Sequence, residues 1–316
     1  MTIALTSAAP SPTSASDDEA PPPVAYAQQA SFLPSPSSLD RERQRRLGHA
    51  VNLLGRLFPG PATQWLWRLW FTPPHTHPNQ RARDLLATVE HRFEVYSGEG
   101  GALVHGWGNG PAVLLAHGWG AYGAQLGSFV PVLQSAGYRV LLLDAPGHGG
   151  QRPRPYRLDQ YAQLLHDVIL HAGDVHAVIG HSLGATAMAM ALNRLDSPAT
   201  YVGVAPTANL KSVLRTFQQR LGLSPDLLAR LERTFADVFG PSWWRDYSLD
   251  HHLPRLRGRA LLVHDQDDSE ASPENSRYLA RLRAGTALHW SQGLGHNRVL
   301  HDREVVQTVA EFIARH

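Results

Sequence analysis

The sequence predicts an α/β protein with a mostly parallel central sheet flanked by helices. From about residue 90 onward, short apolar runs rich in β-branched residues alternate with helix-forming segments. At one junction, Gly180-His181-Ser182-Leu183-Gly184 joins a predicted strand to a predicted helix. The hydrophobic content of 43% over 316 residues is sufficient for one large core plus an extension.

The chain before residue 90 divides into two segments. Residues 1–37 are dominated by Ala, Ser, Pro and Thr, which predicts a flexible tail that buries too little apolar surface to become ordered. Residues 38–89 are predicted to form an N-terminal helical extension, with a helix over 39–58 that Pro59-Gly60-Pro61 ends and a Trp-rich segment after it.

Two interpretations apply to residues 47–71 of this extension. Tryptophan and arginine side chains are typical of segments that contact a membrane surface or a partner. Packing of the extension on the body of the protein is favoured instead, because its apolar residues lie all round and not on one stripe.

Residues 90–316 are predicted to form the α/β domain. An antiparallel pair of strands at 93–96 and 102–104 opens it. Further strands are predicted at 112–116, 138–143, 175–179, 201–204, 260–263 and 287–290. Helices are predicted at 126–136, 158–169 and 185–192, from Ser272-Pro273 onward, and through 305–313. The insertion at about 205–256 is longer than one crossover needs and has helical apolar spacing, which predicts a small helical lid.

Ser182 is the candidate nucleophile. A strand, a Gly-x-Ser-x-Gly turn and a helix together form a nucleophile elbow, in which only small residues fit beside the strained serine. Such a turn is expected to expose the serine hydroxyl at the positive end of the following helix.

A second motif, His-Gly-Trp-Gly, occurs twice, at 105–108 and at 117–120. The second copy follows the apolar strand 112–116. Together with the elbow and the order of strands and helices, it makes the sequence resemble the alpha/beta-hydrolase fold family of the serine esterase type, over about residues 90–316. The copy at 105–108 is expected to be a coincidence without a catalytic role.

The resemblance implies the site residues. It places the oxyanion-hole donors at the backbone N–H groups of Trp119 and Leu183, and it gives His117 a structural role in its loop. The base is His296, in Gly293-Leu294-Gly295-His296 between the last strand and the terminal helix. The order serine, acid, histidine puts the acid after strand 260–263.

Three aspartates compete for the role of the acid: Asp265, Asp267 and Asp268. The family's strand–Gly-x-x-Asp pattern favours Asp268, with Asp267 second. Asp265 is expected to turn the chain and Asp267 to point toward solvent, because like charges oppose the entry of both carboxylates into one site. Asp144 is expected to shape a Pro-Gly turn.

Several classes of function are disfavoured. With 29 basic and 27 acidic residues the charge is too even to indicate a nucleic-acid partner, and without cysteine there is no thiolate nucleophile. The pairs His75/His77 and His251/His252 have no carboxylate at a metal-motif spacing, so neither a metal nor a cofactor is expected. No apolar run precedes Arg41 as a signal core or reaches membrane-spanning length, which makes a cytoplasmic location the default expectation.

The resemblance therefore implies a serine hydrolase that cleaves a small carboxylic ester through a covalent acyl-enzyme. The apolar lid favours a substrate with a hydrophobic acyl or alcohol group. Hydrolysis of a thioester or a carbon–carbon bond, and acyl transfer, are alternatives within the family. A binding protein with a vestigial site is the alternative from another class. The sequence does not indicate an oligomeric state.

Overall fold

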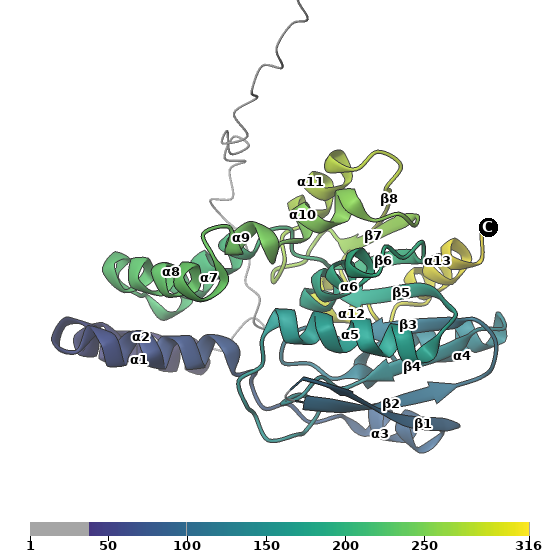
Figure 1. Ribbon diagram of the computed structural model, residues 1–316, viewed down its shortest axis with the longest axis horizontal. Coiled ribbons are helices and arrows are strands. Elements are labelled where there is room, and N and C mark those ends of the chain that lie inside the picture. Colours follow the sequence, from purple (N-terminus) through teal and green to yellow (C-terminus); the bar gives the residue numbers. More distant parts are fainter. Residues whose placement is uncertain (1–37, 99, 316) are drawn as a thin grey trace, which may run out of the picture.

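One mixed sheet of eight strands forms the centre of the protein (Figure 1). The computed structural model describes residues 38–98 and 100–315, so the predicted tail 1–37 lies outside the described residues. The strands are β1 (His91–Ser97), β2 (Gly100–Trp107), β3 (Ala112–Ala116), β4 (Arg139–Leu143), β5 (Val175–His181), β6 (Thr200–Val204), β7 (Ala260–Asp265) and β8 (Ala287–Ser291). Their spatial order is β1-β2-β4-β3-β5-β6-β7-β8.

Only β2 runs against the other strands. It pairs antiparallel with both β1 and β4, whereas all pairs from β4 to β8 are parallel. The prediction of a mostly parallel sheet that begins with an antiparallel pair is confirmed. The chain goes from β3 outward to β4 and then returns to the other side of β3 at β5. Loops at such a reversal of strand order leave a crevice at the carboxyl ends of the strands, where α/β proteins bind ligands.

Helices cover both faces of the sheet. Alternate residues of β3 illustrate this, because Leu114 packs in the core of one face and Leu115 in the core of the other. The first face carries α5 (Leu158–Ala172), α6 (Leu183–Arg194), α10 (Leu249–His252), the 3₁₀ helix Leu253–Arg255 and α11 (Glu274–Leu282). The second carries α3 (Gln80–Ala87), the 3₁₀ helix Gly123–Leu126, α4 (Phe129–Ser135) and α13 (Arg303–Ala314).

Three helix predictions differ from the structure in detail. The helix predicted over 126–136 is two elements, a 3₁₀ turn and then α4, with Gly127 between them. Helix α11 begins at Glu274, with Pro273 as the preceding residue and the Ser272 hydroxyl accepting from the Glu274 N–H at 3.3 Å. Helix α3 was not predicted, because its eight residues carry too few apolar positions for a periodic pattern.

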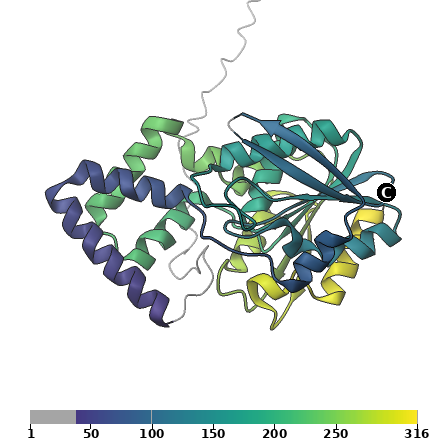
Figure 2. The same ribbon diagram turned by 90° about the horizontal axis from the view of Figure 1, so that it is seen from below.

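The extension and the lid insertion together form a helical cap beside the α/β body (Figures 1 and 2). The cap consists of α1 (Ser38–Leu57), α2 (Pro59–Phe71), α7 (Leu210–Leu221), α8 (Pro225–Phe239) and α9 (Trp243–Asp246). Its separate core includes Leu66 and Phe71 of the extension with Leu231 and Phe235 of the lid. The extension therefore packs mainly on the lid, and not directly on the α/β body as favoured from the sequence, because the lid helices offer it an apolar face.

Polar contacts also join the two halves of the cap. Asn52 of α1 donates from Nδ2 to the Gly222 carbonyl at 2.8 Å and accepts from the Ser224 N–H at 2.9 Å. These bonds hold the turn between α7 and α8 on the extension. Pro59 ends α1 and also begins α2, since a proline costs nothing at the first helical position. Within residues 38–98 and 100–315, no helix is both long and apolar enough to cross a bilayer.

Candidate active site

Ser182 occupies a strained turn between β5 and α6. Its backbone has φ 53° and ψ −120°, outside the regions that non-glycine residues favour. The Ser182 N–H donates to the Val204 carbonyl at 2.9 Å, which ties the turn to β6. Ser182 is only 3% exposed, so the expectation of an exposed hydroxyl is wrong. Gly118 and His296 pack against it.

Two glycines leave the clearance that this turn requires. A Cβ on Gly180 would lie 2.4 Å from Ala185 Cα, and one on Gly184 would lie 2.4 Å from the His117 carbonyl oxygen. Both distances are collisions with backbone. Only glycine therefore allows the helix to begin this close to β5 and to the loop after β3.

Ser182, His296 and Asp268 are brought together from three separate loops. His296, in the short helix α12 (Gly295–Arg298), has its Nε2 at 3.2 Å from Ser182 Oγ. Its Nδ1 lies 2.8 Å from Asp268 Oδ2 and donates to that carboxylate. His296 is 7% exposed and Asp268 is 6% exposed, so both hydrogen bonds are shielded from bulk water.

The Asp268 carboxylate is fully engaged. Its Oδ1 accepts from the N–H groups of Glu270 at 2.7 Å and Ala271 at 2.9 Å. Its Oδ2 also lies 3.3 Å from His264 Nε2. Burial alone would raise the pKa of Asp268, but the contacts with His264 and His296 outweigh it and hold the pKa well below its usual value. Asp268 is thereby kept ionised beside His296.

Asp265 and Asp267 support the loop that carries the histidine. Asp265 Oδ1 accepts from the Gly295 N–H at 2.8 Å, and its Oδ2 accepts from the Leu294 N–H at 3.1 Å. Asp265 also accepts from the Asp267 N–H at 3.0 Å, which agrees with its predicted part in the turn. Asp267 is exposed, as expected, and accepts from the Gly293 N–H at 2.9 Å.

Trp119 and Leu183 flank Ser182 on two sides. Leu183 is the first residue of α6, so its N–H is among those that the start of a helix leaves without an intrahelical acceptor. Trp119 follows Gly118, where an added Cβ would lie 3.1 Å from Ser182 Cβ. The loops after β3 and β5 therefore bring both backbone segments next to the serine.

His117 has the structural role predicted for it. It is fully buried, its Nε2 accepts from the Ala145 N–H at 3.0 Å, and its Nδ1 lies 2.7 Å from the Gly118 carbonyl oxygen. Asp144 accepts from the Gly123 N–H at 2.6 Å and so shapes the neighbouring loop, as predicted. The other tetrapeptide, 105–108, belongs to the end of β2, where Trp107 is buried and donates to the Thr88 hydroxyl at 3.0 Å.

A polar network missed in the sequence analysis lies beside His296. The Asn297 amide donates to Glu270 Oε1 at 3.2 Å and accepts from Gln125 Nε2 at 2.9 Å. Burial raises the pKa of Glu270, and the nearby His296 opposes the shift. Neither an elbow-like motif nor a strand pattern marks these residues, because they come together only through contacts between distant loops.

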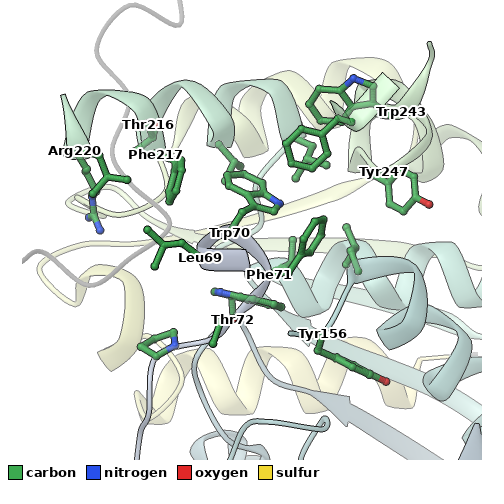
Figure 3. Close-up of a pocket in the computed structure, with 18 of the residues that line it drawn as sticks. Leu69, Trp70, Phe71, Thr72, Tyr156, Thr216, Phe217, Arg220, Trp243 and Tyr247 are labelled. Atoms are coloured by element: carbon green, nitrogen blue, oxygen red, sulfur yellow. The ribbon is translucent and has the colours of Figure 1, made fainter. Parts of the chain in front are cut away.

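An apolar cavity of about 270 Å³ lies between the cap and the α/β body (Figure 3). Trp119 and Leu183 lie at its boundary with the body. The extension contributes Trp70 and Phe71, and the lid contributes Phe235, Phe239 and Trp243. In Figure 3, Arg220 and Tyr247 lie at opposite ends of the cavity. Within the described ranges 38–98 and 100–315, no group of three or more acidic and histidine side chains is arranged to hold a metal ion.

Three buried histidines near the site lead to a prediction about acid stability. Burial lowers the pKa of His117 to about 4 and those of His148 and His181 to about 3. An unfolded histidine titrates near about 6.5. Below that pH the unfolded chain binds more protons, so the free energy of unfolding should fall as the pH decreases, by up to about 1.4 kcal/mol per pH unit for each histidine.

Thermal unfolding measured between about pH 7 and about pH 5 should therefore show a falling Tm. His148→Asn should reduce this slope, because an amide can donate to the Pro146 carbonyl that now lies 3.1 Å from His148 Nδ1. The exposed His75 offers a matched control, and His75→Asn should leave the slope unchanged. A Tm that stays constant over this range would contradict the prediction.

The fold and the loops at the carboxyl ends of its strands define an α/β protein of the hydrolase type. A comparison with protein families agrees, because the model of the alpha/beta hydrolase family matches residues 102–310. The chain belongs to this family. No curated protein matches the sequence significantly.

Solved structures with the same fold include hydrolases from three organisms. A serine hydrolase from Cycloclasticus zankles is 17% identical, with a TM-score of 0.53 over 70% of this chain and 97% of that chain. A monoacylglycerol lipase from Paleococcus ferrophilus is 19% identical, with a TM-score of 0.51 over 67% and 97%. An esterase from a Rhodococcus species is 17% identical, with a TM-score of 0.50 over 71% and 98%. At these identities the likeness establishes the shared fold.

Proposed function

We propose that the protein is a serine hydrolase that cleaves a carboxylic ester through a covalent acyl-enzyme. The observation that carries this proposal is the continuous contact from Ser182 Oγ to His296 Nε2 at 3.2 Å and from His296 Nδ1 to Asp268 Oδ2 at 2.8 Å. A nucleophile, a base and an orienting carboxylate in this arrangement support acyl transfer to the serine.

In the first half of the reaction His296 takes the proton of Ser182 as its oxygen attacks the ester carbonyl. Asp268 holds the histidine ring with Nδ1 protonated and stabilises the imidazolium that forms. The low pKa of Asp268 supports this role, because the carboxylate stays charged while the histidine titrates. The imidazolium then gives its proton to the leaving alcohol.

The tetrahedral intermediate places negative charge on the former carbonyl oxygen. The backbone N–H groups of Trp119 and Leu183 are the proposed donors to it, since both adjoin Ser182. In the second half of the reaction, water attacks the acyl-enzyme with His296 again as the base, which releases the acid and restores the serine.

The ester substrate is proposed to carry a hydrophobic group. The cavity beside Trp119 and Leu183 is lined mainly by aromatic and aliphatic side chains. Such a pocket gains affinity by removing apolar surface from water and offers few partners for a sugar or a phosphate.

Labelling of the intact protein by a fluorophosphonate, followed by assays on matched nitrophenyl esters, thioesters and a carbon–carbon bond substrate, tests the proposal. We expect one label per chain and the highest kcat/KM on an ester. Labelling without ester turnover would favour the carbon–carbon or acyl-transfer alternatives. The absence of both labelling and turnover, in a folded protein, would favour a binding protein with a vestigial site.

A further inference from the structure

We propose that the acyl half of the ester binds in the aromatic end of the cap cavity, between the N-terminal extension and the lid, and that the substrate is an ester of an uncharged apolar acid. This inference rests on the proposed function. It assigns one half of the substrate to one end of the cavity and gives the extension a part in substrate selection.

The two ends of the cavity differ in chemistry. One end contains Phe235, Phe239, Trp243 and Tyr247 (Figure 3 labels the last two). Their rings lie in contact, with 4.5 Å between the ring centroids of Phe235 and Trp243 and 5.2 Å between those of Phe239 and Tyr247. The other end contains Arg220, whose pKa burial lowers to about 10. An apolar chain is therefore favoured at the aromatic end and disfavoured beside the guanidinium.

Electrostatic contacts relate the arginine end to the histidine. Glu270 acts on the pKa of Arg220, and His296 acts on the pKa of Glu270. Arg220 thus lies on the side of the acid loop and of His296. The leaving oxygen must also lie on this side, because His296 Nε2 gives it a proton. The acyl group then extends in the opposite direction, past Leu183 toward the aromatic end.

The extension forms part of this aromatic wall. Phe71, the last residue of α2, lines the cavity and is 7% exposed. Its ring centroid lies 5.9 Å from that of Phe235 and 6.1 Å from that of Phe239. The Phe71 carbonyl accepts from the Tyr156 N–H at 2.8 Å, which ties this end of α2 to the α/β body. The wall is therefore held from both the lid and the body.

The chemistry of the aromatic end defines the substrate class. Asp159 is the one charged side chain of the cavity near Tyr156 and Leu158, and its carboxylate is paired with Arg157 at 2.8 Å. A carboxylate or phosphate on the acyl group would meet no free cation from these residues. Each methylene added to a straight acyl chain should raise kcat/KM about fourfold until the aromatic end is full.

The chain-length profile of nitrophenyl esters, from acetate to dodecanoate, tests this inference. In the wild-type protein kcat/KM should rise with chain length and then fall. Phe239→Trp fills the aromatic end and should lower the ratio of octanoate to acetate turnover about tenfold. Phe71→Leu enlarges the same end from the extension and should move the optimum to longer chains. Trp65→Leu, on the same helix but 36% exposed and outside the cavity lining, should leave the profile unchanged.

Binding of free decanoate separates this inference from the proposed function. It can be followed by tryptophan fluorescence, because Trp70, Trp119 and Trp243 line the cavity. We expect saturable quenching that Phe239→Trp weakens, even if the protein hydrolyses no ester, in which case only the proposed function fails. Ester hydrolysis with a flat chain-length profile, the same in all three variants, would overturn the inference and leave the proposed function standing. Decanoate that competes with the alcohol product and not with the ester's acyl group would also overturn it.

Discussion

Replacement of Ser182 by alanine should lower kcat for ester hydrolysis by about 10⁴–10⁶-fold and abolish fluorophosphonate labelling. The hydroxyl is the group that would bond covalently to the acyl carbon, and His296 Nε2 has no other proton to take in this arrangement. Steady-state kinetics on a nitrophenyl ester and mass spectrometry of the labelled protein measure the two effects.

The fold of this variant should be intact. Alanine keeps the Cβ that Ser182 already accommodates at φ 53°, and the Ser182 N–H bond to the Val204 carbonyl does not involve the side chain. The Tm should therefore stay close to that of the parent protein. Ser135→Ala, at an exposed position on α4, provides a matched serine control with normal labelling. Turnover near the parent level in Ser182→Ala would show that another residue is the nucleophile.

Replacement of Asp268 by asparagine should produce the second large loss, about 10⁴-fold in kcat. An amide at this position would present the wrong hydrogen-bonding group to His296 Nδ1, which lies 2.8 Å from Oδ2. The ring would then favour the tautomer that protonates Nε2 and cannot accept the serine proton. The measurement is kcat across a pH range, with the Tm as a check on folding.

The two neighbouring aspartates are the matched controls. Asp267→Asn should change kcat by less than about tenfold, because Asp267 is exposed and contacts only the outer part of the histidine loop through the Gly293 N–H. Asp265→Asn should reduce stability by about 1–3 kcal/mol, because an amide group would face N–H donors that the carboxylate now accepts. A severe loss at Asp267 beside a mild loss at Asp268 would reverse the assignment of the acid.

Much of the architecture could be predicted from local sequence. The strand at 112–116 is apolar throughout and the helix at 158–169 has regular apolar spacing, so both were predicted to within a few residues of β3 and α5. The elbow is also local, since Gly180, Ser182 and Gly184 lie within five residues and the clearance they require is a property of the turn itself. Short elements such as α3 carry too little pattern for this kind of inference.

The partner of the extension could not be predicted in this way. The sequence of α2 is apolar on several sides, which indicates burial but not the surface that covers it. In the structure the lid helices α7 and α8 supply that surface, and Asn52 binds the turn between them. Both segments are amphipathic, and only their meeting more than a hundred residues apart along the chain decides that they form one cap.

The sequence by itself determined the fold class, the elbow and the small set of residues among which the acid and the base had to be sought, because periodicity, glycine clearance and strand order are all expressed locally. Only the tertiary structure decided which aspartate meets His296, that His264 shares the Asp268 carboxylate, and that Glu270, Asn297 and Gln125 form a network beside them. These contacts join loops from different strands. Their distances depend on how the strands and helices pack, and no local pattern records that packing.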